Sequence, residues 1–313
     1  CAPSGFLPPW PGGNLPDFHN FTIDLEYTIP SMRTNFVLVF LLVLAFQCDS
    51  LFAQDMAEKP PEDSLHFQWE RFSVNLGFFL TTINSDVSLS GTETGLGINL
   101  NMEDGLGLST SSFVIRGEAS YNFGSNLRSH ARLGYFGLIR NSSKTLENEI
   151  SIGDTTFPVG TYLSSRYDLH IIRALYDYAY FQDERFSFAV SGGFYILPVN
   201  FSIGTRNVIN ESAKFIAPLP VIGFRNIFFV TPKIQLKQNL EVLYVKTSNF
   251  KGSITDLNVY VEYNPFKHFG LGAGFKSFNF DFSVSGETRR SWDFDGSIHT
   301  GFTGVLLYGR YYF

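Results

Sequence analysis

Apolar and polar residues alternate along most of the chain after residue 70. A period of two is typical of β-strands that have one apolar face, because successive side chains point to opposite sides of a strand. The final segment shows the alternation clearly, since Val305, Leu307, Tyr311 and Phe313 share one face and Arg310 lies on the other. The same segment closes the chain.

The alternation predicts ten strands, at 71–83, 112–123, 127–141, 162–180, 184–203, 215–230, 233–247, 254–264, 267–284 and 297–313. Tight turns and longer polar connections separate them, and the long ones are predicted at 84–111, 142–161, 204–214 and 285–296. Short turns at one end and long loops at the other are typical of a closed, antiparallel, up-and-down barrel. Eight or twelve strands are alternatives, because Asp86–Ser90 and Gly95–Asn101 could pair as an extra hairpin.

Three predicted strands contain irregularities. The alternation changes phase after Ile171 in 162–180, which favours a β-bulge near Ile172. In 267–284 the phase changes after Phe275, which indicates either a bulge near Lys276 or an upper half that leaves the membrane and turns its aromatic residues inward. Pro218 and Pro220 predict that the upper part of 215–230 is irregular, since proline lacks the backbone N–H of a strand ladder.

An export signal is predicted ahead of the strands. Met32 and Arg33 precede an apolar run from Phe36 to Phe46, which is shorter than the roughly 20 residues of a membrane-spanning helix. We expect residues 32–53 to be a signal peptide and residues 1–31 a non-native upstream extension. Residues 54–70 would form a periplasmic lead, and 71–313 the barrel.

The signal, the strand alternation and the terminal aromatic residue resemble those of bacterial outer-membrane β-barrels. In shape the segment 71–313 resembles OmpW-like barrels and the transmembrane domain of OmpA. This resemblance implies an outer-membrane location in a Gram-negative bacterium, contact with outer-membrane lipid and lipopolysaccharide, and a monomer. It also implies that Tyr311 and Phe313 act as an assembly signal for the barrel assembly machinery. A water-soluble β-sandwich shares the same period, but tyrosines gathered at the short-turn ends favour the membrane barrel.

Composition narrows the functional classes. Residues 54–313 contain no cysteine, the net charge is −6, and no stripe of lysine and arginine suggests a nucleic-acid partner. No histidine, cysteine or carboxylate cluster has metal-ligand spacing, and we expect no cofactor.

The predicted inward faces carry charges of both signs, and we expect them to form a polar network in the lumen. Its predicted members are Arg116, Glu118, His130, Arg132, Arg166, Asp168, His170, Arg173, Asp177, Lys237, Glu241, Glu262, Lys276 and Arg310. The network indicates either a self-neutralising core, because lone charges away from water are costly, or a narrow polar conduit.

The sequence predicts a passive membrane protein rather than an enzyme, with small-solute passage or structural and surface-binding roles through the loops. The alternative is a lipid-modifying hydrolase acting on lipid A or phospholipid. Ser297 and His299 lie two residues apart on one strand face, with Asp295 just upstream. A serine, a histidine and a carboxylate can form an activated nucleophile, although spacing alone does not aim the serine at the imidazole.

Overall fold

The computed structural model describes residues 69–90, 97–147, 149–152, 155–205, 208–246, 250–284 and 296–313. The predicted upstream extension, the signal peptide and most of the predicted lead lie outside the described residues. Within these ranges no helix is long and apolar enough to cross a membrane.

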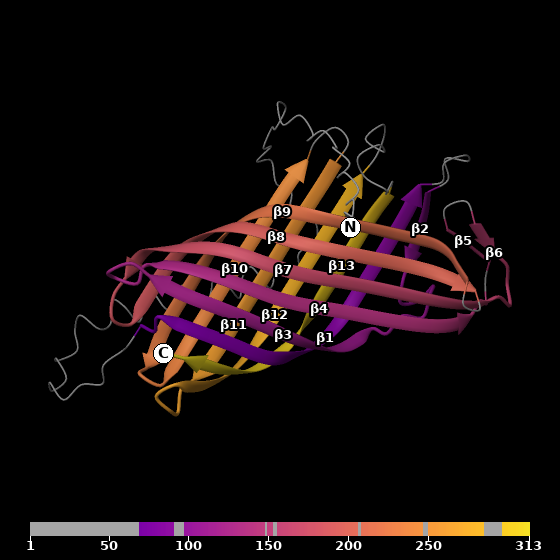
Figure 1. Ribbon diagram of the computed structural model, residues 1–313. Coiled ribbons are helices and arrows are strands. Elements are labelled where there is room, and N and C mark those ends of the chain that lie inside the picture. Colours follow the sequence, from indigo (N-terminus) through magenta and orange to yellow (C-terminus); the bar gives the residue numbers. More distant parts are fainter. Residues whose placement is uncertain are drawn as a thin grey trace, which may run out of the picture.

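Ten long strands form one closed antiparallel barrel, which confirms the predicted fold class and strand number. They are β1 (Phe72–Ser90), β3 (Ser111–Phe123), β4 (Ser129–Thr145), β7 (Tyr162–Gln182), β8 (Phe186–Thr205), β9 (Val208–Thr231), β10 (Ile234–Lys246), β11 (Phe250–Tyr263), β12 (Phe269–Val284) and β13 (Gly296–Tyr312). Each strand pairs with the next along the chain, and β13 pairs with β1 from Ser73↔Tyr312 to Leu89↔Gly296. In Figure 1, β4, β7, β8 and β9 cross β10 to β13 because the two sets form opposite walls.

Three short strands lie at the long-loop end. The extra hairpin foreseen in 84–111 is present, because β2 (Gly97–Asn101) pairs with the end of β1. The strands β5 (Ile150–Ile152) and β6 (Thr155–Phe157) form a separate pair between β4 and β7. The predicted long loop at 204–214 is wrong, since β8 and β9 continue to Thr205↔Val208.

An apolar belt surrounds the half of the barrel nearer the short turns. On β1 the outward Leu76, Phe78 and Leu80 are 63%, 52% and 55% exposed, and beyond them the outward residues are Thr82 and Asn84. We call this band of outward apolar side chains the belt. The 19 residues of β1 exceed the roughly 9–11 that a strand needs to cross a bilayer. The half nearer the long loops therefore projects beyond the bilayer.

The barrel interior changes character with height. Buried charged residues fill the half inside the belt, whereas the projecting half is mainly apolar inside and holds one buried ion pair, between Arg140 and Glu103. Between them Phe79, Phe136, Phe278 and Phe302 pack with ring centroids 4.7–5.8 Å apart, and we call these four residues the aromatic layer. Hydrophobic side chains from the segment after β2 cover the layer from above: Met102, Leu106 and Leu108.

The bulge predicted near Ile172 is wrong. The pairing of β7 with β4 is unbroken from Thr145↔Tyr162 to Ser129↔Tyr178, so Tyr167 and Leu169 face the apolar interior of the projecting half. The shift in β7 lies instead between Ala179 and Phe181. In β12 the register is also unbroken, and Phe278, Phe280 and Phe282 are buried inside. The second of the two readings for 267–284 is therefore the right one.

The prolines of β9 end its pairing with β10 rather than the strand itself. Pro218 and Pro220 pair with Ile196 and Phe194 of β8, so the predicted irregular segment is a continuous strand. The β9–β10 ladder stops at Ile222↔Val242, just before the prolines. A proline cannot donate a ladder hydrogen bond, which accounts for the loss of pairing on that side only.

Candidate functional site

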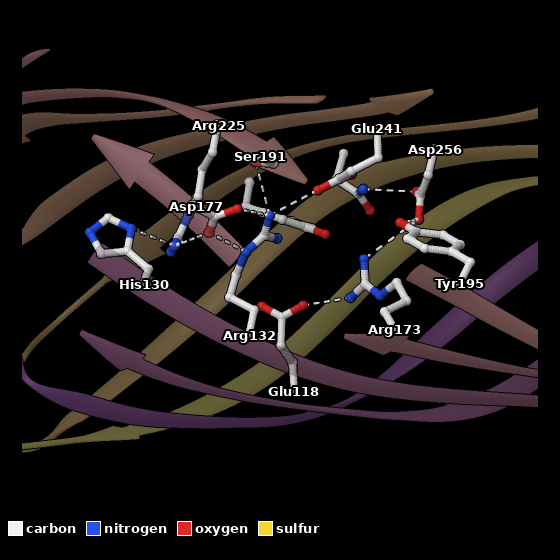
Figure 2. A network of polar contacts seen from close by, with 12 residues as sticks. Glu118, His130, Arg132, Arg173, Asp177, Ser191, Tyr195, Arg225, Glu241 and Asp256 are labelled. Atoms are coloured by element: carbon white, nitrogen blue, oxygen red, sulfur yellow. Dashed lines mark hydrogen bonds and ion pairs between the residues drawn. The ribbon is translucent and has the colours of Figure 1, made fainter. Parts of the chain in front are cut away.

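The largest group of polar side chains that the fold brings together is a buried network inside the belt. At its centre Arg132 of β4 donates from Nε and Nη2 to the two carboxylate oxygens of Asp177 on β7, at 2.6 and 2.7 Å. Its Nη2 also donates to Glu241 Oε1 on β10 at 3.1 Å (Figure 2). The side chains of these three residues are 2%, 0% and 0% exposed. Arg225 of β9 adds a second cation to Asp177 at 3.2 Å.

A second cluster continues the network towards the aromatic layer. Arg173 contacts Glu118 on one side and Asp256 Oδ2, at 3.5 Å, on the other. The hydroxyl of Tyr195 donates to Asp256 Oδ2 at 2.9 Å, as Figure 2 shows. Lys276 also pairs with Asp256. The network thereby joins strands that are far apart in sequence.

A third cluster ties the closing strand to the beginning of the barrel. Glu262 accepts from Tyr308 at 2.6 Å and pairs with Lys237 at 2.7 Å and with Arg310 at 3.0 Å. Arg310 also pairs with Glu70, just ahead of β1. These contacts join the first and last strands of the barrel, in the interior near the short turns.

The network leaves little free space. Cations and anions occur in nearly equal numbers, and each buried ion pair offsets the desolvation of its members. The interior cavity between Arg116, Arg225, Tyr260 and Tyr308 measures about 20 Å³. A cavity of that size has room for about one water molecule.

The structure brings most of the sequence-predicted lumen residues together. Buried inward positions are occupied by Arg116, Glu118, His130, Arg132, Arg173, Asp177, Lys237, Glu241, Glu262, Lys276 and Arg310. Arg166, Asp168 and His170 are not among them. Because β7 has no bulge at Ile172, these three side chains lie on the outward wall above the belt, where Arg166 is 54% exposed and pairs with Asp168 at 2.8 Å.

The predicted lumen set did not include four members of the network: Arg225, Tyr195, Asp256 and Glu70. Arg225 lies between Phe224 and Asn226 in a strand with large apolar residues on both faces, so parity gave no clear signal there. The partner role of Tyr195 could have been noticed, because a buried tyrosine needs a hydrogen-bond partner for its hydroxyl.

At the rim, the predicted serine–histidine pair does not form. His299 Nδ1 lies 2.6 Å from Asp281 Oδ1 on the neighbouring strand β12, and Ser253 Oγ donates to Asp281 Oδ2 at 3.0 Å. His299 Nε2 lies 3.7 Å from the place where a Cβ on Gly301 would stand, so the ring leans away from Ser297. No hydrogen bond joins the described Ser297 and His299, and Asp295 lies outside the described residues.

The Asp281–His299 pair lies on the outward wall of the projecting half, because the belt on β13 begins only at Val305. The hydrogen bond to Asp281 raises the pKa of His299 above its usual 6.5, although partial burial opposes the shift. Across the β1–β13 ladder, Asp86 stands opposite His299 and favours the charged imidazole further. Within the described residues, no group of three or more His, Cys, Asp or Glu side chains could hold a metal ion.

No protein-family model matches the chain, and no curated protein sequence matches it. Solved structures of similar shape include the outer-membrane protease OmpT of Escherichia coli, with 9% identity over 80% of this chain and 99% of that one and a TM-score of 0.46. Ail, the attachment invasion locus protein of Yersinia pestis, matches with 11% identity over 79% and 100% of the two chains and a TM-score of 0.33. The toluene transporter TodX of Pseudomonas putida matches with 8% identity over 79% and 90% and a TM-score of 0.30.

These likenesses are too distant to carry an argument about activity, and the proteins differ in what their names describe. The closed barrel and its belt are the architecture of a transmembrane β-barrel protein. The outer membrane of a Gram-negative bacterium stays the predicted location. The narrower likeness to OmpW-like barrels stays a prediction.

Proposed function

We propose that this protein is a closed outer-membrane barrel with a passive structural or surface-binding role at its long-loop end. One observation carries the proposal: among the described residues, side chains occupy the interior both inside the belt and in the projecting half. Ion pairs occupy the half inside the belt, and the aromatic layer, its apolar cover and the buried Arg140–Glu103 pair occupy the projecting half.

The filled interior argues against the other passive role, passage of small solutes. A polar solute or ion on its way through would have to separate buried ion pairs, and breaking such a pair costs about 3–5 kcal/mol. It would then have to cross the dry aromatic layer, where a charge loses its hydration without gaining a partner. Neither step has a compensating interaction among the described residues.

Planar bilayers provide the direct test. The purified protein would first be shown to be folded by its different gel mobility before and after boiling. We then expect no discrete current steps between about −150 and about +150 mV, which is roughly twice a typical membrane potential in each direction. A general porin inserted in the same bilayers serves as the positive control. Reproducible steps from the folded protein would show that the lumen conducts and would overturn the proposal.

The Asp281–His299 hydrogen bond favours a second candidate, hydrolysis of a lipid at the rim. The carboxylate orients the imidazole, and its Nε2 would take a proton from water once deprotonated. The raised pKa of His299 opposes this role near neutral pH, because a protonated imidazole cannot accept that proton. In this proposed hydrolysis His299 activates water directly, so the reaction needs neither Ser297 nor a second carboxylate on β13.

Mass spectrometry of membrane lipids separates the candidates. Cells that overproduce the intact protein and cells that overproduce His299→Ala would be compared with cells carrying an empty vector. Lipid A or phospholipid altered by the intact protein alone would support hydrolysis. Identical lipids in all three would eliminate it and leave the closed barrel as the proposed function.

A further inference from the structure

The belt is hollowed on one wall. The hollow measures about 820 Å³ and crosses β3, β4, β7 and β8 on their outward side. Its floor consists of small residues, Ala119, Ala131, Ala174 and Gly192. Its sides are the large residues Tyr121, Leu133, Tyr176 and Phe194.

The hollow follows from the strand register. In one row across the wall, Ala119 stands opposite Leu133, Leu133 opposite Ala174, and Ala174 opposite Phe194. In the next row towards the short turns the order is reversed, with Tyr121, Ala131, Tyr176 and Gly192 in succession. Because small and large residues alternate and the two rows are offset by one strand, the small positions form a continuous zigzag across four strands.

The hollow lies within the hydrocarbon region rather than at its edge. On β4 the next outward residue above Leu133 is Tyr135, which is large and exposed and pairs with the outward Ile172 of β7. On β7 the outward residues below Tyr176 are Tyr178 and Tyr180. Apolar or aromatic side chains therefore border the hollow on both sides along the strands.

We propose that the hollow seats one acyl chain of a phospholipid from the periplasmic leaflet. This inference rests on the membrane placement of the barrel and goes beyond its proposed passive role. The lining of the hollow is apolar, and its open side faces the surrounding lipid, from which a chain can enter. At the short-turn side the Tyr176 hydroxyl and Ser129 Oγ, 3.1 Å apart, provide polar groups near the level of the lipid headgroups.

A flexible chain fits this site better than a second copy of the barrel does. A two-fold contact centred here would place hollow against hollow, because an isologous interface brings the same patch of both copies together. Such a contact would leave an empty space whose lining loses dispersion contacts. A single acyl chain can follow the zigzag and restore those contacts.

Filling the hollow tests the proposal. A Cβ on Gly192 would have no heavy atom within 4 Å, so Gly192→Leu combined with Ala174→Leu can fill the space without backbone strain. Ala273→Leu is the matched control, because Ala273 is an outward, exposed belt residue on β12 in the opposite wall. All variants would first be checked for the native gel mobility of the unboiled barrel.

Native mass spectrometry of protein extracted from outer membranes counts the retained lipids. The wild type and Ala273→Leu are expected to carry one phospholipid per barrel, and the filled variant to carry about tenfold less, since its chain contacts are gone. Equal retention in all three would overturn the proposal, as would retention of lipopolysaccharide in place of phospholipid. A wild-type dimer that the filled variant loses would show that a second copy occupies the hollow. None of these outcomes alters the conductance result that tests the closed lumen.

Discussion

Replacing Arg132 by methionine tests whether the buried network holds the barrel together. The change removes four hydrogen bonds, one of them to Ser191, and leaves Asp177 and Glu241 without their shared cation. Asp177 keeps Arg225 at 3.2 Å, but Glu241 Oε2 has no hydrogen-bond partner in the described structure. Removing one partner of a buried ion pair costs about 3–5 kcal/mol, because the other charge stays buried. The ratio of folded to unfolded protein should fall by a factor between about one hundred and several thousand.

The free energy of unfolding is measured by urea titration in lipid vesicles. The folded fraction at each urea concentration is the share of protein that, without boiling, runs on a gel at the position of the folded barrel. Arg166→Met is the control, because the Arg166 side chain is 54% exposed on the outer wall, and its single ion pair with Asp168 should contribute less than the buried pairs of Arg132. Adding Glu241→Met to Arg132→Met should recover part of the loss, since it removes the unpaired anion. If Arg132→Met proved as mild as Arg166→Met, the network would not be the source of stability that its geometry indicates.

Three further expectations concern other levels of the barrel. Phe302→Ala should lower the free energy of unfolding by about 3–5 kcal/mol through the cavity it leaves in the aromatic layer, measured by the same urea titration. Gly304→Ala should weaken the pairing of β13 with β1, because a Cβ there would meet the Leu80 backbone. Gly309→Ala on the same strand makes ordinary contacts and is the control. The temperature at which each variant loses the gel mobility of the folded barrel would show the difference. His299 should titrate above 6.5 by NMR, and Asp281→Asn should lower its pKa. Since the folded pKa is raised, the stability from this pair is fully present below about pH 6.5 and is lost as the pH rises through the folded value, so Asp281→Asn should cost more at pH 5 than at pH 9.

Parity predicted the architecture well where strands lie inside the bilayer. Lipid outside and charges inside impose opposite side chains on alternate positions, so Arg132 and Glu241 could be assigned inward from their neighbours alone. The signal reverses in the projecting half, where Tyr167 and Phe280 face a dry protein interior. A dry interior and lipid select the same apolar side chains, which is why an unbroken β7 looked bulged in sequence.

The same reversal misplaced the outer-wall residues, because a polar residue above the bilayer faces water outside rather than charge inside. The true partner of His299 could not be found within one strand. Asp281 stands opposite His299 across the β12–β13 ladder, and that register depends on a long connection whose geometry sequence does not specify. Asp295, the predicted carboxylate, is close to His299 along the chain but lies outside the described residues.

The length of the strands beyond the belt determines which part of this protein is accessible from outside the cell. At about 3.3 Å per residue, the part of β1 beyond Leu80 extends well beyond the hydrocarbon, and its backbone there is hydrogen-bonded to β13. An antibody against the described strands of this half should label intact bacteria if the predicted outer-membrane location is right. A molecule that binds this half of the barrel from outside the cell would therefore contact strands whose backbone geometry is fixed by their pairing.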